Sequence, residues 1–272
     1  MRDTAEILEI NELSDEYIET SLSIVEAYFR SVGEELRRAQ QGSMNVQYKP
    51  DKSPFTDHDK KVEEGLKQLL STYDPTVGFY GEEYGISGNP HTYWLIDPID
   101  STTSFIANRP GSTNMAALMH NGKPQCAIVF DFYSGHETMY TATEKNGALK
   151  NGEPFSARSN EGQPTIWIDC KDKERRDDLY DRASEFGFIP SSLAPPNGSR
   201  LVELGQSLDV QICINPNAGP YDLVPGLYIA QKSGVDVRTI GSKTWDPLNL
   251  NVIASASKDH ALVAESLIPS SQ

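Results

Sequence analysis

The spacing of hydrophobic and polar positions predicts two amphipathic helices in the first part of the chain. From about residue 13 to residue 39, Leu22, Val25, Phe29 and Leu36 recur at helical spacing and form one apolar stripe. A second helical pattern runs from about residue 59 to residue 70. Each segment is therefore expected to fold as a helix with one buried face.

Short apolar segments follow and predict a series of strands. We expect these strands at residues 77–80, 93–96, 113–119, 124–132 and 138–141. Asn121-Gly122 is a strong hairpin signal, because a type I′ turn needs positive φ at both central residues. Ser134-Gly135, Asn146-Gly147 and Asn151-Gly152 are further turn candidates, so several of the strands should form a meander.

Past residue 152 the pattern changes to an alternation of strand and helix. A strand is expected at residues 165–169, followed by a charged helix through Leu179 and Phe186. A loop rich in proline and glycine comes next, at residues 190–199. Alternation of this kind is typical of α/β structure.

Composition and charge narrow the class of protein. The 272 residues, 38% hydrophobic and 23% charged, suit a globular protein with one large core or two modest ones. No apolar run approaches the length of a membrane span and the first residues do not resemble a signal peptide, so we expect a cytoplasmic protein without membrane contact. The odd number and wide separation of the cysteines favour structural thiols at Cys126, Cys170 and Cys213.

The net charge of −15 argues against nucleic-acid polymers as partners, because a phosphate backbone needs clustered lysine and arginine. The five histidines are scattered singly, which does not suggest a transition-metal site. An acidic protein that acts on phosphate esters would need bound cations to reverse the local sign of charge.

The most informative stretch is residues 94–105, where an apolar segment ends in Asp97 and Asp100 and small hydroxyl residues follow. We predict that the strand stops before Asp97, because Pro98 removes a backbone donor and fixes a turn. Two carboxylates three residues apart across such a turn can converge on hard cations, which prefer oxygen ligands. The alternative is that the two aspartates are only a turn residue and a helix N-cap.

Carboxylates also follow two other predicted elements. Gly81-Glu82-Glu83 comes directly after the strand expected at residues 77–80. Asp59 lies at the start of the second predicted helix, where an aspartate is usually a cap and can also be functional.

These motifs resemble those of the inositol monophosphatase family, within the superfamily that includes fructose-1,6-bisphosphatase and the bisphosphate nucleotidases. Asp59 falls where the family has Thr-x-x-Asp, and residues 81–83 match its Gly-Glu-Glu. Residues 97–102 match its Asp-Pro-Ile-Asp-Gly-Thr, with serine in place of the glycine. Together with a Gly-Ala-x-x-Asn-Gly match at residues 147–152, the resemblance covers roughly residues 51–255.

The resemblance implies a layered α/β/α/β/α sandwich with its metal site between two halves. We expect an N-terminal α+β half at residues 1–155, which carries most of the metal ligands, and a C-terminal α/β half at residues 156–272. The boundary would fall near residues 153–163. A cleft between halves is a common place for a ligand site.

Two aspartates compete for the position that closes this site in the family. Asp222 has a glycine four residues on, Gly226, and an apolar helical pattern after it, as the family motif has. Asp246 follows a tryptophan, as in the family, but lies too near the C-terminus. We therefore assign Asp222 to the site and expect Asp246 in a late turn at residues 241–247. On this alignment the chain closes with a strand at residues 251–255 and a helix at residues 260–267.

The resemblance implies two Mg²⁺ ions bound by oxygen ligands. Asp97 would bridge the two ions. The first ion would also take Glu82 and the Ile99 carbonyl, and the second would take Asp100 and Asp222. A weaker third ion held by Glu82 is compatible with the family arrangement.

The implied reaction is hydrolysis of a small phosphate monoester by metal-activated water. Asp59 would work with the Thr102 hydroxyl, beside Glu82, to position and deprotonate that water. Backbone N–H groups at Ser101, Thr102 and Thr103 would bind phosphate oxygens.

Two positions of the motifs depart from the family pattern. Glycine at position 101 would permit unusual dihedrals, so the Cβ of Ser101 either crowds the phosphate or its hydroxyl adds a hydrogen bond to it. Tyr221 stands where the family has tryptophan and would keep an aromatic wall beside the leaving group.

The substrate pocket is specified less well than the metal site. Where inositol-specific members place an acidic group, the polar candidates are Asn215 and Asn217, which turn formation explains equally well. Ser199 and Arg200 are further candidate substrate contacts by resemblance, whereas Arg109 reads more simply as a solvated loop residue.

The substrate that we expect is an inositol monophosphate or a related sugar or polyol phosphate. Ser104-Phe105-Ile106 resembles the histidinol-phosphate phosphatase branch, and a bisphosphate nucleotidase is a further alternative. A homodimer is expected from the resemblance. The rival hypothesis from another class is a binding or scaffold protein without catalysis, although a scaffold has no need of converging carboxylates that repel each other without cations.

Overall fold

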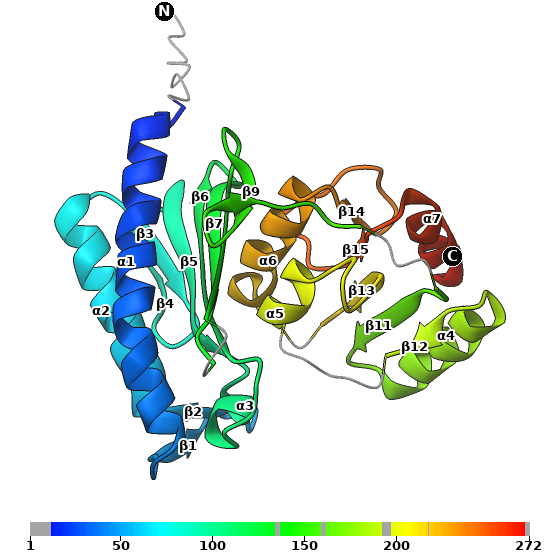
Figure 1. Ribbon diagram of the computed structural model, residues 1–272, viewed down its shortest axis with the longest axis horizontal. Coiled ribbons are helices and arrows are strands. Elements are labelled where there is room, and N and C mark those ends of the chain that lie inside the picture. Colours follow the sequence, from blue (N-terminus) through cyan, green and yellow to red (C-terminus); the bar gives the residue numbers. More distant parts are fainter. Residues whose placement is uncertain (1–11, 134–136, 159–161, 192–196, 217, 270–272) are drawn as a thin grey trace, which may run out of the picture.

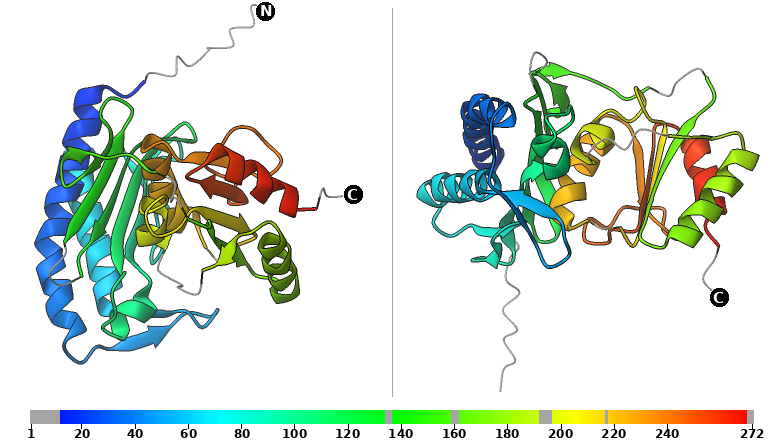
Figure 2. Two further views of the ribbon diagram at one scale, coloured as in Figure 1. Left: turned by 45° about the vertical axis from the view of Figure 1, so that its right-hand side comes forward. Right: turned by 90° about the horizontal axis from the view of Figure 1, so that it is seen from below.

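The computed structural model describes residues 12–133, 137–158, 162–191, 197–216 and 218–269, and it forms five stacked layers. Two long helices cover one face of an eight-stranded sheet, and two further helices separate that sheet from a second, five-stranded sheet (Figure 1). Another two helices, α4 and α7, cover the outer face of the second sheet (Figure 2). This arrangement is the α/β/α/β/α sandwich that the family resemblance implied.

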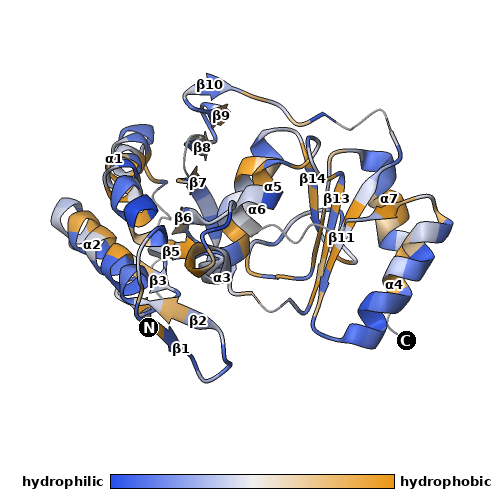
Figure 3. Ribbon diagram, turned by 60° about the horizontal axis from the view of Figure 1, so that its bottom comes forward, coloured by the Kyte–Doolittle hydropathy of each residue, from blue (hydrophilic) through white to orange (hydrophobic). Residues whose placement is uncertain are grey.

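The outer layer on the N-terminal side consists of α1 (Asp15–Gln40) and α2 (Asp57–Tyr73). The hydroxyl of Ser14 accepts a hydrogen bond from the Tyr17 N–H at 3.2 Å and so caps α1. The predicted apolar stripe of α1 is buried against the sheet, while its other side is hydrophilic (Figure 3). A short hairpin of β1 (Val46–Tyr48) and β2 (Pro54–Thr56) links the two helices.

The first sheet has the strand order β10-β9-β8-β7-β6-β5-β3-β4. Its strands are β3 (Gly78–Gly81), β4 (Gly85–Ser87), β5 (Thr92–Asp100), β6 (Thr113–His120), β7 (Lys123–Asp131), β8 (Thr138–Thr143), β9 (Gly147–Lys150) and β10 (Glu153–Pro154). From β5 to β10 consecutive strands pair antiparallel, as the predicted meander requires. Asn121 and Gly122 both have positive φ, at 49° and 76°, and form the expected hairpin turn. The Ser134-Gly135 turn lies outside the described residues.

The second sheet follows with the order β12-β11-β13-β15-β14. Its strands are β11 (Thr165–Cys170), β12 (Ile189–Pro190), β13 (Val210–Ile214), β14 (Asp236–Thr239) and β15 (Val252–Ser255). The helices α4 (Lys173–Glu185) and α7 (Lys258–Leu267) pack on its outer face. The pairs β11–β12 and β11–β13 are parallel, which fits the predicted alternation of strand and helix.

The central layer consists of α5 (Asn197–Val202) and α6 (Pro220–Lys232), which lie between the two sheets (Figure 2). Residues 223–230 of α6 are all buried, because one side of the helix meets the first sheet and the other side meets the second. A helix that is apolar all round requires such an enclosed position. None of the described helices is both long and apolar enough to cross a membrane.

Candidate active site

The strand β5 does not stop before Asp97-Pro98, as the proline led us to predict, but continues to Asp100. Its pairing with β6 shifts at this point. Asp97 lies opposite Met115 and Asp100 lies opposite Thr113, so β5 has one residue more than β6 between the two pairs. The extra residue forms a β-bulge, a position at which a sheet tolerates proline.

The bulge determines where the two carboxylates point. In a regular strand, residues three apart lie on opposite faces of the sheet. Met115 and Thr113 are two residues apart on β6 and therefore share a face, so their partners Asp97 and Asp100 share it as well. Met115 packs in the same cluster as Val224 of α6, which identifies this face as the one toward the central layer.

Asp97 is the buried centre of a carboxylate cluster. One oxygen each of Glu82, Asp97 and Asp222 lie within 4.8 Å of one another. Both carboxylate oxygens of Asp97 are buried and have no hydrogen-bond partner among the described residues. Burial, together with the charges of Glu82 and Asp222, raises the pKa of Asp97 well above its ordinary range.

Glu82 enters the cluster from the end of β3. Its N–H donates to the Ile96 carbonyl at 3.1 Å, which continues the parallel pairing of β3 with β5 beyond the last strand residue. The ammonium group of Lys49, from the connection between β1 and β2, lies 2.7 Å from a carboxylate oxygen of Glu82 and 2.7 Å from one of Glu83. Burial opposes the charge on Lys49, but the two carboxylates outweigh burial and raise its pKa.

Asp222 reaches the cluster from α6, in the helical layer between the two sheets. It is the third residue of α6, and its Oδ2 accepts a hydrogen bond from the Gly219 N–H at 2.5 Å. Burial and then the charge of Glu82 raise the pKa of Asp222 well above its ordinary range. The ring of the preceding Tyr221 packs edge-on against Tyr80, with 5.5 Å between ring centroids. Helix α6 therefore brings a carboxylate and an aromatic side chain to the end of β3.

Asp59 lies at the start of α2 and is fully buried. Its Oδ2 accepts hydrogen bonds from the Thr56 N–H and the Thr56 hydroxyl, each at 2.7 Å. Its Oδ1 accepts from the Thr102 hydroxyl at 3.1 Å, and that hydroxyl also lies 3.2 Å from the Ile99 carbonyl. Burial raises the pKa of Asp59 to about 6. The N-cap of α2 is therefore Thr56, while Asp59 closes a capping box from the third helical position and also accepts from Thr102.

Asp100 faces the first turn of α5. Its Oδ2 accepts a hydrogen bond from the Gly198 N–H at 2.6 Å, and burial raises its pKa to about 7. A Cβ at position 198 would lie 2.3 Å from the Thr113 hydroxyl and 2.6 Å from the Met115 sulfur, so only glycine permits this close approach. Asp100 is not among the residues of the tight cluster around Asp97.

Ser101 adopts the left-handed conformation that explains why glycine suits this position. Its φ and ψ are 60° and 57°, and the short helix α3 (Thr102–Ile106) begins directly after it. The Ser101 hydroxyl donates to the Ser104 hydroxyl at 3.0 Å and so stabilises the turn locally. Thr102 is buried in this segment, whereas Thr103 is exposed.

The predicted substrate contacts lie in different surroundings. The Ser199 hydroxyl donates to the Gly111 carbonyl at 3.2 Å and ties α5 to the segment after α3. Arg200 is buried, and its guanidinium carbon lies 4.5 Å from the centroid of the Trp167 ring. Burial lowers the pKa of Arg200, while the neighbouring Cys213 and then Asp100 oppose that shift. Arg109 is exposed, in agreement with a solvated loop residue.

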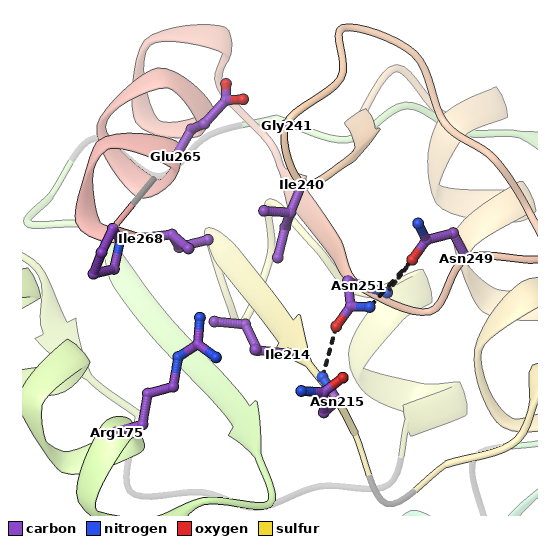
Figure 4. A pocket seen from close by; sticks show the side chains of 10 residues that line it. Arg175, Ile214, Asn215, Ile240, Gly241, Asn249, Asn251, Glu265 and Ile268 are labelled. Carbon is purple, nitrogen blue, oxygen red and sulfur yellow. Dashed lines mark hydrogen bonds between the residues drawn. The ribbon is translucent and has the colours of Figure 1, made fainter. Parts of the chain in front are cut away.

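Asn215 borders a separate cavity in the C-terminal half (Figure 4). Its N–H donates to the Asn251 side chain at 2.7 Å, and the cavity of about 430 Å³ is also lined by Arg175 and Glu265. None of the clustered carboxylates lines this cavity, so its position gives no support to a substrate contact through Asn215. The other candidate, Asn217, lies outside the described residues.

Asp246 lies in the late turn, as predicted. Its carboxylate accepts a hydrogen bond from the Leu248 N–H at 3.1 Å, and its own N–H donates to the Thr239 hydroxyl at 2.8 Å. The side chain is exposed and belongs to neither the carboxylate cluster nor its surroundings.

Two residues beside the cluster were missed in the sequence. No sequence pattern pointed to Lys49, because it lies in the short connection between β1 and β2, two strands of three residues each. Glu63 lies four residues after Asp59 on the same helix face, a spacing that could have identified it. The Glu63 carboxylate accepts hydrogen bonds from the N–H groups of Glu83 at 2.8 Å and Tyr84 at 3.3 Å, and so fixes the chain after Glu82.

The arrangement fits a divalent cation. Three carboxylates converge, with Asp97 fully buried between the half-buried Glu82 and Asp222, and no described residue donates a hydrogen bond to Asp97. Such a group either stays protonated or binds a positive charge. Oxygen ligands of this kind suit a hard cation such as Mg²⁺.

Known proteins have sequences similar to that of this chain. A sequence model described as the inositol monophosphatase family matches residues 18–271. A chloroplastic bifunctional phosphatase of Arabidopsis thaliana is 30% identical over 273 residues, which cover 94% of this chain and 78% of the relative. A histidinol-phosphatase of Mycobacterium tuberculosis is 35% identical over 99 residues, which cover 35% of this chain and only 38% of the relative.

The solved structures include a protein with the same fold. An inositol monophosphatase and NADP phosphatase, crystallised with Mg²⁺ and phosphate, aligns with a TM-score of 0.75 over 94% of this chain and 97% of that protein. The two sequences are 19% identical, so this likeness concerns the fold.

Proposed function

The chain belongs to the inositol monophosphatase family and is a phosphatase by that membership, and we propose that it hydrolyses a small phosphate monoester with the aid of Mg²⁺. The observation that carries the proposal is the convergence of Glu82 and Asp222 on Asp97, whose carboxylate has no hydrogen-bond partner in the described part of the chain. This cluster would be strongly destabilising without a cation, which argues against the scaffold hypothesis.

The proposed metal ligands are the ones that the motifs suggested. Asp97 would be shared by two Mg²⁺ ions, with Glu82 and the Ile99 carbonyl on the first and Asp100 and Asp222 on the second. Mg²⁺ held there would neutralise charge on the phosphate and on the leaving oxygen. The structural relative crystallised with Mg²⁺ and phosphate supports this choice of ion.

Asp59 and Thr102 are proposed to hold the attacking water. The Thr102 hydroxyl donates to Asp59 at 3.1 Å, which leaves a lone pair of the hydroxyl oxygen available to accept a hydrogen bond from water. A carboxyl with a pKa of about 6 is ionised at neutral pH and is well matched to accept a proton. Glu82 is proposed to assist from the cluster side.

The phosphate is proposed to bind beside α3. The backbone N–H groups of Ser101, Thr102 and Thr103 would donate to phosphate oxygens, as in the family motif. The left-handed backbone at Ser101 supports this proposal, because it is the conformation that the glycine of the motif would supply. Ser199, Arg200 and Asn215 stay predictions as substrate contacts.

Histidinol phosphate is a second candidate substrate beside the inositol and polyol phosphates. It is favoured by the match to the Mycobacterium tuberculosis histidinol-phosphatase and by the sequence Ser104-Phe105-Ile106. The homodimer, the cytoplasmic location and the number of ions stay predictions.

The proposal is tested by phosphate release from a panel of monoesters. The panel comprises inositol monophosphates, histidinol phosphate, sugar phosphates and adenosine bisphosphate, each with Mg²⁺ and with a chelator. We expect release that requires Mg²⁺ and is lost in Asp97→Asn. Asp246→Asn is the matched control, because it makes the same change at an exposed turn. Release that persists in Asp97→Asn or without Mg²⁺ would contradict the proposal, and the preferred ester would identify the substrate class.

A further inference from the structure

A buried asparagine lies beneath the bulge that carries the proposed metal ligands. Asn114 is on β6, between Thr113 and Met115, the two residues that pair with Asp100 and Asp97. Side chains alternate along a strand, so Asn114 points to the opposite face, toward α1 and α2. Its neighbours Ala116 and Leu118 on that face belong to the apolar cluster of the outer layer.

The side chain of Asn114 forms a bond that the sheet cannot form at this point. Its amide nitrogen donates to the Pro98 carbonyl at 2.5 Å. Pro98 lies within the bulge, where the regular ladder between β5 and β6 is interrupted. The Asn114 side chain therefore supplies a hydrogen-bond donor to the Pro98 carbonyl, which lies in the bulge between Asp97 and Asp100.

Burial of the Asn114 side chain reduces the stability of the fold, because the hydrogen bond to Pro98 satisfies only part of its amide. Asn114 is fully buried, and its carbonyl oxygen has no hydrogen-bond partner among the described residues. A buried unpaired acceptor is destabilising, so an apolar residue on this face would be expected if stability alone mattered. The exception calls for a role beyond packing.

We propose that Asn114 is a positioning residue for the metal site, which holds the bulge so that Asp97 and Asp100 stay on one face of the sheet. The inference rests on the proposed function. Without the amide, the Pro98 carbonyl loses its donor and the bulge can shift along β5. A shift of one residue would turn one of the two carboxylates toward the apolar outer layer.

The test is the Mg²⁺ dependence of Asn114→Leu, which removes the amide and keeps a similar size. We expect the Mg²⁺ concentration for half-maximal thermal stabilisation to rise about tenfold or more, as for partners that orient metal ligands. The unfolding temperature in chelator should stay near that of the parent chain. At saturating Mg²⁺, kcat should recover, because no group that contacts the substrate has changed.

A matched control is available in the other sheet. Gln211 is also a buried amide, which donates to the Cys213 sulfur at 3.4 Å and whose carbonyl oxygen finds no partner among the residues that the structure describes. Gln211→Leu should leave the Mg²⁺ dependence unchanged. Should Asn114→Leu fail to fold, Asn114→Ser keeps a polar group that is too short to reach the Pro98 carbonyl.

The outcomes separate this inference from the proposed function. Stabilisation of Asn114→Leu at the same Mg²⁺ concentration as the parent chain would overturn the positioning role while leaving the phosphatase intact. Equal weakening in Gln211→Leu would overturn it as well, since the effect would then be one of general packing. A parent chain that Mg²⁺ does not stabilise would overturn the proposed metal site, and with it the role of Asn114.

Discussion

Helices α2 and α6 begin in the same way but deliver their carboxylates to different surroundings. Asp59 and Asp222 are each the third residue of their helix, and each uses Oδ2 to accept a hydrogen bond from the backbone N–H of its N-cap residue. In α2 that residue is Thr56, whose hydroxyl donates to Asp59 as well. In α6 it is Gly219, which has no side chain to donate.

The second carboxylate oxygens of Asp59 and Asp222 also have different neighbours. Asp59 faces the hydroxyl of Thr102, so three donors surround its carboxylate and its pKa is about 6. Asp222 lies beside two other carboxylates, Glu82 and Asp97, and its pKa is raised well above its ordinary range by burial and then by the charges of Glu82 and Asp100. The same local motif thus prepares one aspartate to accept a proton and leaves the other in need of a cation.

The largest effect is expected for Asp222→Asn. Asparagine can still accept the hydrogen bond from the Gly219 N–H, so α6 should keep its start. Loss of a metal ligand should lower kcat/KM at least about a thousandfold. In chelator the variant should be more stable than the parent chain by about 1–3 kcal/mol, because one buried like charge is gone. Chemical denaturation checks the stability, and an unchanged or lower value would contradict the interpretation of the cluster.

Asp59→Asn should reduce activity without removing the metal site. Its amide cannot accept a proton from water through the Thr102 hydroxyl, and we expect a loss of about 10²–10³ in kcat. KM and the Mg²⁺ dependence should change little. Steady-state kinetics at several Mg²⁺ concentrations check this, and a loss that excess Mg²⁺ restores would place Asp59 with the metal ligands instead.

The pH dependence of protein stability should reveal the raised pKa of Asp59. Its pKa in the folded protein is about 6, above the ordinary value of 3.8, so the folded state resists ionisation more than the unfolded state. In chelator, the contribution of Asp59 to stability should therefore be lost as the pH rises from about 4 to about 7, by up to about 3 kcal/mol. Denaturant titrations of the parent chain and Asp59→Asn across this range check the difference. Parallel pH profiles for the two proteins would show that Asp59 is not perturbed.

Thr56→Val would make the cap of α2 resemble the cap of α6. The change removes the hydroxyl that donates to Asp59 at 2.7 Å and accepts from the His58 N–H at 3.2 Å. Loss of this cap should cost about 1–2 kcal/mol. The pKa of Asp59 should rise, since a donor to its charged form is gone, and the acid limb of the pH–rate profile should move to higher pH. A limb that stays in place would show that the hydroxyl does not stabilise the carboxylate.

The smallest effect is expected for Ser101→Gly. Relief of the left-handed conformation should stabilise the protein by about 1 kcal/mol, less whatever the hydrogen bond to Ser104 contributes. Because the Thr102 hydroxyl keeps its direction toward Asp59, kcat should change less than about threefold. A shift in the thermal unfolding midpoint measures the first effect. A large rise in kcat would instead indicate that the Ser101 side chain crowds the phosphate.

The resemblance to the family implied the layers of the fold and pointed to the carboxylates that cluster in the structure. Helical spacing identified α1 and α2, and the Asn121-Gly122 turn identified a hairpin of the meander, because these signals are local. The motifs led to Glu82, Asp97 and Asp222 through resemblance, and the structure places Asp222 beside the other two carboxylates and Asp246 in an exposed turn.

Features that depend on strand register could not be predicted. Pro98 suggested the end of a strand, but pairing with β6 carries β5 through a bulge to Asp100. The role of Asn114 follows only once that bulge is known. Lys49 reaches Glu82 from a connection with no motif of its own, and Arg200 turned out to be buried against Trp167. These contacts join segments far apart in the chain, where local patterns carry no information.

The most direct test is a titration of thermal stability with Mg²⁺ for three proteins: the parent chain, Asp59→Asn and Asp222→Asn. We expect Mg²⁺ to raise the unfolding temperature of the parent chain and of Asp59→Asn alike, and to raise that of Asp222→Asn less and only at higher Mg²⁺ concentration, because Asp222 is a ligand of the second proposed ion. Equal stabilisation of Asp222→Asn, or none of the parent chain, would contradict the assignment of the Glu82, Asp97 and Asp222 cluster as the metal site.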